Sequence, residues 1–193
     1  MKLEAKDLLT LEEYDSQRDV IKKDVISHKK NRTISVGENI VLIFEDYNTI
    51  KYQVQEMLRI EKIFKQAEIQ EEIDAYNPLI PDGTNLKATM LIMYPEVEVR
   101  KKMLFKLHGI ENSIWISVGG NKITAYADED LDRSTDDKTS AVHFLRFQFD
   151  QNDISNFLSG SEVKIGVTHA EYNKEIIIDG QYRKSLENDL DSK

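Results

Sequence analysis

The chain has 193 residues, which is enough for one domain with a sizeable buried core. Its 35 acidic and 26 basic residues give a net charge of -9, which argues against nucleic acid and anionic membranes as partners, since both bind cationic surfaces. The absence of cysteine excludes disulfides, thiolate nucleophiles and cysteine-held iron–sulfur clusters.

The first residues, MKLEAKDLLTLEEY, place acids where a signal peptide requires an unbroken apolar run. No apolar segment approaches the roughly 18 residues that a membrane-spanning helix requires. With 40% hydrophobic and 32% charged residues, the composition is typical of a folded globular protein. We therefore expect a soluble cytoplasmic protein.

Helical patterns dominate the N-terminal part of the chain. The capping motif TLEE predicts the start of a first helix over 10–28. Two β-branched runs within 33–44 then predict a hairpin around a Gly-Glu-Asn turn. The spacing of apolar residues predicts a long helix over 48–67 and a shorter helix over 68–76.

The stretch AYNPLIPDG, residues 75–83, contains two of the three prolines in the chain. Because Asn77 precedes a proline, we expect it to leave the helical region and to end the helix. Pro78 and Pro81 are expected to hold the two residues between them extended, and the Asp-Gly pair to turn the chain into a strand. This stiff corner would also suit the wall of a binding site.

Strand patterns dominate the rest of the sequence. The expected strands cover 85–94, a hairpin over 113–127 around two glycines, 139–149, 162–169 and 175–179. Short helices are expected over 95–108 and 150–160, with a weak last helix over 182–190.

These elements predict an α+β fold, in which a largely antiparallel or mixed sheet of hairpins packs against an N-terminal helical half. We expect a single domain over 1–180, with the helical half over about 1–76 and the sheet half over about 84–180. Residues 181–193 are expected to form the weak helix and a charged tail.

Common catalytic motifs are missing from the sequence. The loop DEDLDRSTDD, residues 128–137, has six acids in ten positions and opens like a calcium loop. Arg133 stands where that loop needs glycine, and Thr139 stands where it needs a bidentate glutamate, so we expect a solvated loop. No glycine-rich phosphate loop, GxSxG elbow or HExxH pair occurs.

Several polar residues share faces with apolar ones. Gln53 and Glu56 lie in the apolar arc of the long helix, and Glu72 lies beside isoleucines of the next helix. Strand alternation places His143 and His169 with inward apolar residues. Two histidines with one or two carboxylates could ligate zinc, manganese or iron, or could supply a general base. Alternatively, each is a buried polar residue satisfied by a neighbour.

Four motifs resemble an uncharacterised prokaryotic family, catalogued as domain of unknown function three-five-zero-one. They are QVQEMLRIEK (53–62), EEIDAYNPLIPDG (71–83), SAVHFLRF (140–147) and GVTHAEY (166–172). Family members are often encoded beside a rubrerythrin-like protein and an iron–sulfur oxidoreductase. The resemblance thus implies a redox or peroxide-defence setting, without implying any catalytic residue.

The resemblance also adds weight to residues within its shared motifs, namely Gln55, Glu56, Tyr76, Asn77 and His169. It weakens His143, since relatives carry glutamine at that position. The candidate pocket therefore comprises Gln53, Glu56, Glu72, Tyr76, Asn77, His143 and His169. The candidate ligands for a divalent iron, zinc or manganese ion are Glu56, Glu72, His143 and His169.

Three functional hypotheses follow. The first is a non-catalytic accessory protein that docks to a redox partner, either the rubrerythrin-like protein or the iron–sulfur oxidoreductase. The second is a metal-binding protein or enzyme that uses the glutamate and histidine candidates. The third is a small-ligand binder lined by the proline corner, Tyr76 and Trp115. The sequence leaves open whether the protein catalyses a reaction.

Overall fold

The computed structural model describes residues 2–129, 132–135 and 137–191, and its helices and antiparallel sheets confirm the predicted α+β class. Three helices build the N-terminal part, namely α1 (Leu11–Lys30), α2 (Tyr47–Glu61) and α3 (Gln66–Tyr76). The predicted capping box opens α1, because the Thr10 hydroxyl accepts from the Glu13 amide and the Glu13 carboxylate accepts from the Thr10 amide.

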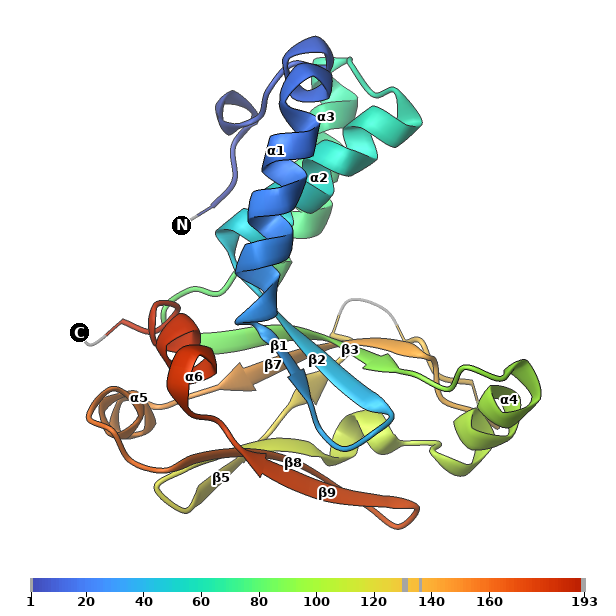
Figure 1. Ribbon diagram of the computed structural model, residues 1–193, viewed down its shortest axis with the longest axis vertical. Coiled ribbons are helices and arrows are strands. Elements are labelled where there is room, and N and C mark those ends of the chain that lie inside the picture. The colour runs from blue at the N-terminus through green and yellow to red at the C-terminus, as the bar shows by residue number, and fades with distance from the viewer. Residues whose placement is uncertain (1, 130–131, 136, 192–193) are drawn as a thin grey trace.

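The strands form two antiparallel sheets. The first sheet has the order β1-β2-β3-β7-β6 and consists of β1 (Thr33–Ser35), β2 (Ile40–Glu45), β3 (Asn85–Ile92), β7 (Val142–Gln148) and β6 (Tyr126–Ala127). The second has the order β5-β4-β8-β9 and consists of β5 (Asn121–Thr124), β4 (Ile114–Val118), β8 (Val163–His169) and β9 (Tyr172–Ile177). The two sheets lie one above the other (Figure 1).

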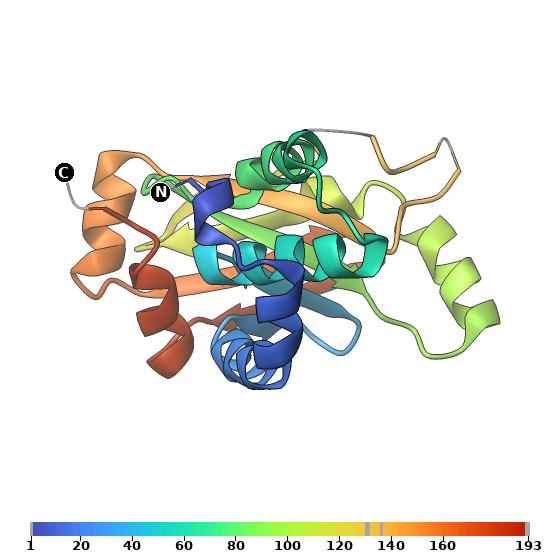
Figure 2. The ribbon, with the colours of Figure 1, turned by 90° about the horizontal axis from the view of Figure 1, so that it is seen from above.

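The main core fills the space between the two sheets. Alternate residues point inward from both layers, as they do for Leu42, Phe44 and Phe147 of the first sheet and for Ile116 and Ile165 of the second. Helices α5 (Gln151–Leu158) and α6 (Gly180–Glu187) lie at one end of this sandwich, and α4 (Val97–Lys106) lies at the other (Figure 2).

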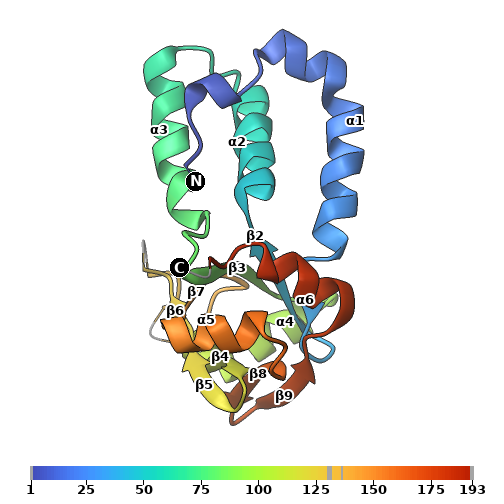
Figure 3. The ribbon, with the colours of Figure 1, turned by 90° about the vertical axis from the view of Figure 1, so that its left-hand side faces the viewer.

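The three N-terminal helices project from the outer face of the first sheet (Figure 3). They have a separate apolar core, which includes Ile50, Val54, Leu58 and Ile73. We expected one sheet to pack against these helices. Instead, the first sheet packs mainly against the second sheet, and the helices contact its outer face only at the ends nearest to it (Figure 3). That arrangement creates an inner corner between the projecting helices and the outer face of the first sheet.

The boundaries of the second and third helices differ from the prediction. The apolar pattern predicted one helix over 48–67, but α2 ends at Glu61. Lys62 adopts the left-handed conformation with φ 57°, and its amide donates to the Leu58 carbonyl. Phe64, which continues the apolar spacing, is 73% exposed in the turn between α2 and α3.

The local conformation of the proline corner differs from the prediction. Asn77 stays in the right-handed helical region at φ -53° and ψ -37°, and Asn77–Leu79 form a 3₁₀ turn instead of an extended segment. Ile80 is extended, and Gly83 then turns the chain at φ 96° into β3. The corner thus places the end of α3 above the first sheet.

The predicted hairpin over 113–127 is correct only in its first part. β4 and β5 pair around Gly119 and Gly120, but Tyr126–Ala127 leave that sheet and pair with β7 in the first one. This crossover brings the following loop to the outer face of the first sheet. None of the helices in the described ranges is both long and apolar enough to cross a membrane.

Candidate binding cleft between the helices and the first sheet

A cleft of about 730 Å³ lies in the corner between α2, α3 and the first sheet. The helices and the proline corner contribute one wall, which consists of Met57, Glu72, Ala75, Tyr76, Pro78 and Leu79. The predicted candidates Glu72 and Tyr76 therefore belong to a cleft. The proline corner, whose expected stiffness would also suit a binding-site wall, forms part of this wall.

Three charged residues cross the floor of the cleft in one row. The strand registers place Glu45 of β2 opposite Lys87 of β3, and Lys87 opposite Arg146 of β7. Tyr126 of β6 lies opposite Arg146 and continues the row. Because side chains alternate along a strand, these residues share the face that looks toward the helices, while Phe44 and Phe147 face the core.

Glu45 is a buried carboxylate with incomplete hydrogen bonding. Glu45 is only 4% exposed, and its Oε1 atom accepts a hydrogen bond from the Thr89 hydroxyl at 2.8 Å. The second carboxylate oxygen, Oε2, is buried without a hydrogen-bond partner. A buried, unsatisfied oxygen is costly, so its position beside a cleft identifies a point where a donor would be stabilised.

Lys87 ties the sheet to the proline corner. Its ammonium group donates a hydrogen bond to the Pro78 carbonyl. Burial lowers the pKa of Lys87. This contact holds one wall of the cleft against its floor.

Arg146 contacts a neighbouring acid and a ring. Its Nε and Nη2 atoms each lie 2.7 Å from an oxygen of Glu129, which gives a bidentate ion pair. The guanidinium also stacks on the Tyr126 ring at 4.5 Å. Hydrogen bonding from Arg146 lowers the pKa of Glu129.

The loop after β6 supplies a second wall of the cleft, to which Glu129 and Arg133 contribute. The Arg133 guanidinium stacks on the ring of Phe144 at 4.5 Å and lies 3.3 Å from an Asp128 oxygen. Part of the predicted solvated loop, residues 130, 131 and 136, lies outside the described residues. At Asp128 the prediction was wrong, because this carboxylate is held by His143 and by the Phe144 amide.

Glu72 lies on the upper wall without a hydrogen bond or ion pair to any residue of the described chain. Burial, followed by repulsion from Glu61 and Glu71, raises the pKa of Glu72. Glu72 and Glu45 are therefore the two carboxylates of the cleft that retain unused acceptor capacity.

Glu56 belongs to a different part of the molecule from Glu72. Both of its oxygens accept from the Arg18 guanidinium, at 2.7 and 2.8 Å, and one accepts from the Tyr14 hydroxyl at 2.6 Å. The Arg18 guanidinium lowers the pKa of Glu56 to about 2, despite the opposing effect of burial. Glu56 thus joins α2 to α1.

His143 points into the core, as strand alternation predicted, and is fully buried. Its Nδ1 atom lies 2.5 Å from Asp128, while Nε2 lies 2.8 Å from the Thr139 hydroxyl and 3.1 Å from the Ser140 carbonyl. The Thr139 hydroxyl donates in turn to Glu111 at 2.8 Å. This network fastens both ends of the 128–139 loop to β7.

His169 lies at the end of β8, beyond the buried part of that strand, and is half-buried. Its Nε2 atom lies 3.2 Å from the His108 carbonyl, and its Nδ1 atom accepts from the Glu171 amide at 3.2 Å. Alternation predicted its face correctly but could not show that the core stops before it.

The four proposed metal ligands are therefore engaged separately rather than together. Glu56 joins two helices, Glu72 lines the cleft, and His143 and His169 contact different loops. Across residues 2–129, 132–135 and 137–191, no group of three or more histidines and acids is placed to hold a metal ion. The predicted cluster does not form there.

The other candidates have structural contacts or lie away from the cleft. Asn77 accepts from the Leu3 amide at 2.8 Å and donates to the Leu3 carbonyl at 3.0 Å, which anchors the N-terminal segment. Gln55 binds both backbone groups of Leu9 in the same way. Gln53 is half-buried and is not part of the cleft lining.

Trp115 was expected beside the proline corner but lies in the second sheet. Its indole nitrogen donates to the Thr168 hydroxyl at 2.8 Å, and the Lys122 ammonium lies 4.3 Å from the ring centroid. The small-ligand hypothesis therefore keeps the proline corner and Tyr76 and loses Trp115.

The sequence matches, over residues 2–190, the family model described as "Protein of unknown function (DUF3501)". The chain belongs to this family. The resemblance inferred from the four motifs is thereby confirmed. No curated protein matches the sequence.

A solved structure is similar to this DUF3501 chain over its whole length. It is a crystal structure at 1.90 Å resolution of a novel protein of unknown function from Burkholderia pseudomallei K96243. The two sequences are 46% identical, and the match covers 99% of this chain and 100% of the other, with a TM-score of 0.93. The similarity supports the fold on which the cleft depends.

Sequence reasoning missed the floor of the cleft. Glu45, Lys87 and Arg146 occur in three different strands, and no spacing rule connects them. Period-two alternation could have placed each of them on the face opposite the apolar core. Their alignment in one row depends on strand register, which the sequence does not specify locally.

Proposed function

We propose that this DUF3501 protein is a non-catalytic accessory protein that binds a small molecule in the cleft. The cleft itself supports the proposal. Its volume of about 730 Å³ falls in the range of roughly 300–1,000 Å³ that is usual for small-molecule sites. Its walls come from three segments far apart in the sequence, and they combine apolar side chains with a few polar groups.

The contacts of two candidate residues, which could have served an enzyme, support a non-catalytic role. Glu56 is committed to Arg18, and His143 is committed to Asp128 and Thr139. A general base needs access to the proton that it abstracts, and His143 has no exposed surface. These residues support the scaffold around the cleft.

The proposal is tested with a variant that fills the cleft. Ala75 is an exposed residue of α3 that lines the cleft, so Ala75→Trp adds a ring there without displacing a core side chain. Ala67→Trp is the matched control, since Ala67 is exposed on the same helix and does not line the cleft.

A chemically diverse set of small molecules is screened against the wild type by ligand-observed NMR. We expect binders whose signals respond to wild type and Ala67→Trp but not to Ala75→Trp. Binding that survives Ala75→Trp, or a screen without any binder, would show that the cleft is not a ligand site.

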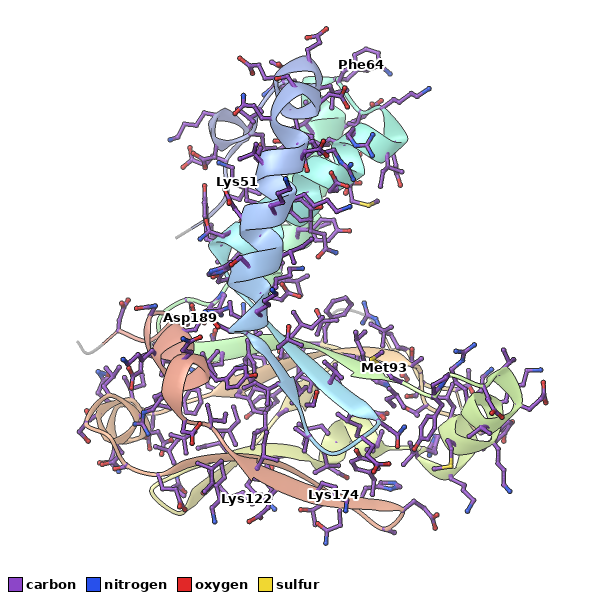
Figure 4. The ribbon with its side chains drawn as sticks, viewed as in Figure 1. Lys51, Phe64, Met93, Lys122, Lys174 and Asp189 are labelled. Atoms are coloured by element: carbon purple, nitrogen blue, oxygen red, sulfur yellow. The ribbon has the colours of Figure 1, made fainter. Side chains whose placement is uncertain are left out.

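A second candidate function is docking to a redox protein, as the resemblance implied. Exposed apolar residues at the tip of the helical projection support it, because Phe64 lies there and is 73% exposed (Figure 4), and Ile60, in the last turn of α2, is 62% exposed. The proposed partner is the rubrerythrin-like protein or the iron–sulfur oxidoreductase. This partner would carry the redox-active iron, since the present chain has no cysteine to hold a cluster.

Isothermal titration of each purified candidate partner with this protein tests the docking proposal. Phe64→Asp is expected to weaken binding at least tenfold, because it places a charge in an apolar contact. Phe105→Asp on α4 is the matched control, since Phe105 is also exposed but lies at one end of the sandwich. Equal affinities of the two variants would argue against docking through the tip.

A further inference from the structure

The charges that line the cleft are equal in number but are not equally engaged. Lys87, Arg133 and Arg146 are the cations, and Glu45, Glu72 and Glu129 are the acids. The Arg146 guanidinium is paired with Glu129, and that pair neutralises both members.

The two other cations also have acceptors. Lys87 donates to the Pro78 carbonyl, and Arg133 lies beside the Asp128 carboxylate. Two acids differ from these, because Glu45 leaves Oε2 without a partner and Glu72 has no bonding partner in the described ranges. Each cation of the cleft therefore already lies against an acceptor, whereas these two acids keep acceptor capacity unused.

On this basis, and resting on the proposed ligand-binding function, we propose that the cleft binds a small molecule that carries a protonated primary amine on an apolar body. Oε2 has almost no accessible surface, so the Glu45 carboxylate rotates toward the cleft on binding, and the ammonium group then donates to Oε2. A charge-assisted hydrogen bond to a buried carboxylate is among the stronger contacts that a small ligand can make.

The remaining walls fit the rest of such a molecule. Met57, Tyr76 and Leu79 supply a thioether, a ring and an aliphatic side chain above the floor. On the floor, Phe144 also lines the cleft, and the Arg133 guanidinium stacks on its ring. An aromatic or aliphatic body of the ligand would pack between these surfaces.

Glu72 extends the same preference for positive charge. It lies on the helical wall above the floor that carries Glu45, and its partial burial together with the nearby Glu61 and Glu71 raises its pKa, so its ionised form is less favourable than in water. A bound cation offsets that repulsion. Lys87 acts in the opposite sense, so the amine must reach Oε2 from the side away from the Lys87–Pro78 contact.

Three probes with similar bodies test this assignment, namely 2-phenylethylamine, 2-phenylethanol and 3-phenylpropionate, which are cationic, neutral and anionic at pH 7. Affinities are measured by NMR titration of the full chain. We expect 2-phenylethylamine to bind at least tenfold more tightly than 2-phenylethanol, and 3-phenylpropionate not to bind measurably.

The decisive variant is Glu45→Gln, which keeps the shape of the side chain and removes its charge. It is expected to weaken 2-phenylethylamine binding by about 10- to 100-fold, the range for loss of a charged hydrogen bond. Glu98→Gln on α4 is the matched control, since that carboxylate is 83% exposed and should leave binding unchanged.

The outcomes separate this inference from the proposed function. One outcome is that the neutral or anionic probe binds best, with binding that is abolished by Ala75→Trp and unchanged by Glu45→Gln. In that case the cleft is a ligand site but the amine assignment is wrong. If no probe and no member of the broader screen responds to Ala75→Trp, both are wrong. If Glu45→Gln unfolds, as its circular dichroism would reveal, the order of the three wild-type affinities still decides the assignment.

Discussion

Replacing Glu56 by glutamine tests whether that carboxylate is a structural ion-pair partner rather than a metal ligand. The substitution keeps the volume and an oxygen for the Tyr14 hydroxyl, but it removes the negative charge that faces Arg18. Lowering the pKa of Glu56 from 4.5 to about 2 corresponds to about 3 kcal/mol of stabilisation of the ionised form. Because the pair borders on solvent, screening reduces the expected loss of unfolding free energy to about 1–2 kcal/mol at pH 7.

The same pKa gives the sign of the pH dependence. The folded state lowers the pKa of Glu56, so its contribution is present above the unfolded pKa and is lost as pH falls toward 2. The difference in unfolding free energy between wild type and Glu56→Gln should therefore shrink by about a quarter at pH 4 and by more than half at pH 3.

Urea unfolding followed by circular dichroism at pH 7, 4 and 3 measures this difference. Glu98→Gln serves again as control, because its pair with Lys101 is highly exposed and should give almost no loss at any pH. A Glu56→Gln penalty that is independent of pH would refute the ion-pair explanation. So would a penalty that appears only when iron, zinc or manganese is added, which would instead favour the metal-binding alternative.

Three further substitutions test other parts of the structure. Burial raises the pKa of Asp189 to about 6, so the folded state loses stability as pH rises from about 4 to 6. The free energy of unfolding of the wild type, relative to that of Asp189→Asn in urea, should therefore fall by about 2–3 kcal/mol between pH 4 and pH 7. Gly166→Ala would place its Cβ 2.3 Å from the Trp115 ring and should cost about 1–3 kcal/mol in thermal unfolding, with partial recovery when Trp115→Ala is added. Asn77→Ala removes both hydrogen bonds to Leu3, so hydrogen exchange at the Leu3 amide should accelerate at least tenfold while exchange in the sheets stays unchanged.

Local signals in the sequence were sufficient for most individual elements. The TLEE capping motif starts α1, and alternation placed His143 on the inward face of β7. The same kind of signal failed between α2 and α3. Phe64 continues the apolar spacing, yet the backbone turns at Lys62 and leaves its ring in solvent.

The candidate site depends on contacts between segments that the sequence does not relate. The proline corner was expected to be rigid and suited to a wall, and Pro78 and Leu79 do line the cleft. The floor of the cleft, which lies opposite these residues, depends on the pairing of β2, β3 and β7. That pairing aligns Glu45 with Lys87 and Arg146. Register of this kind is fixed by the packing of the whole sheet, so the cleft could not be assembled from local patterns.

A crystal structure of the protein with 2-phenylethylamine tests the central claim most directly. The account predicts the ammonium nitrogen within about 3 Å of Oε2 of Glu45, with the ring against Met57 and Leu79. An ordered water molecule alone at Oε2, with the amine bound at carboxylates outside the cleft, would contradict it.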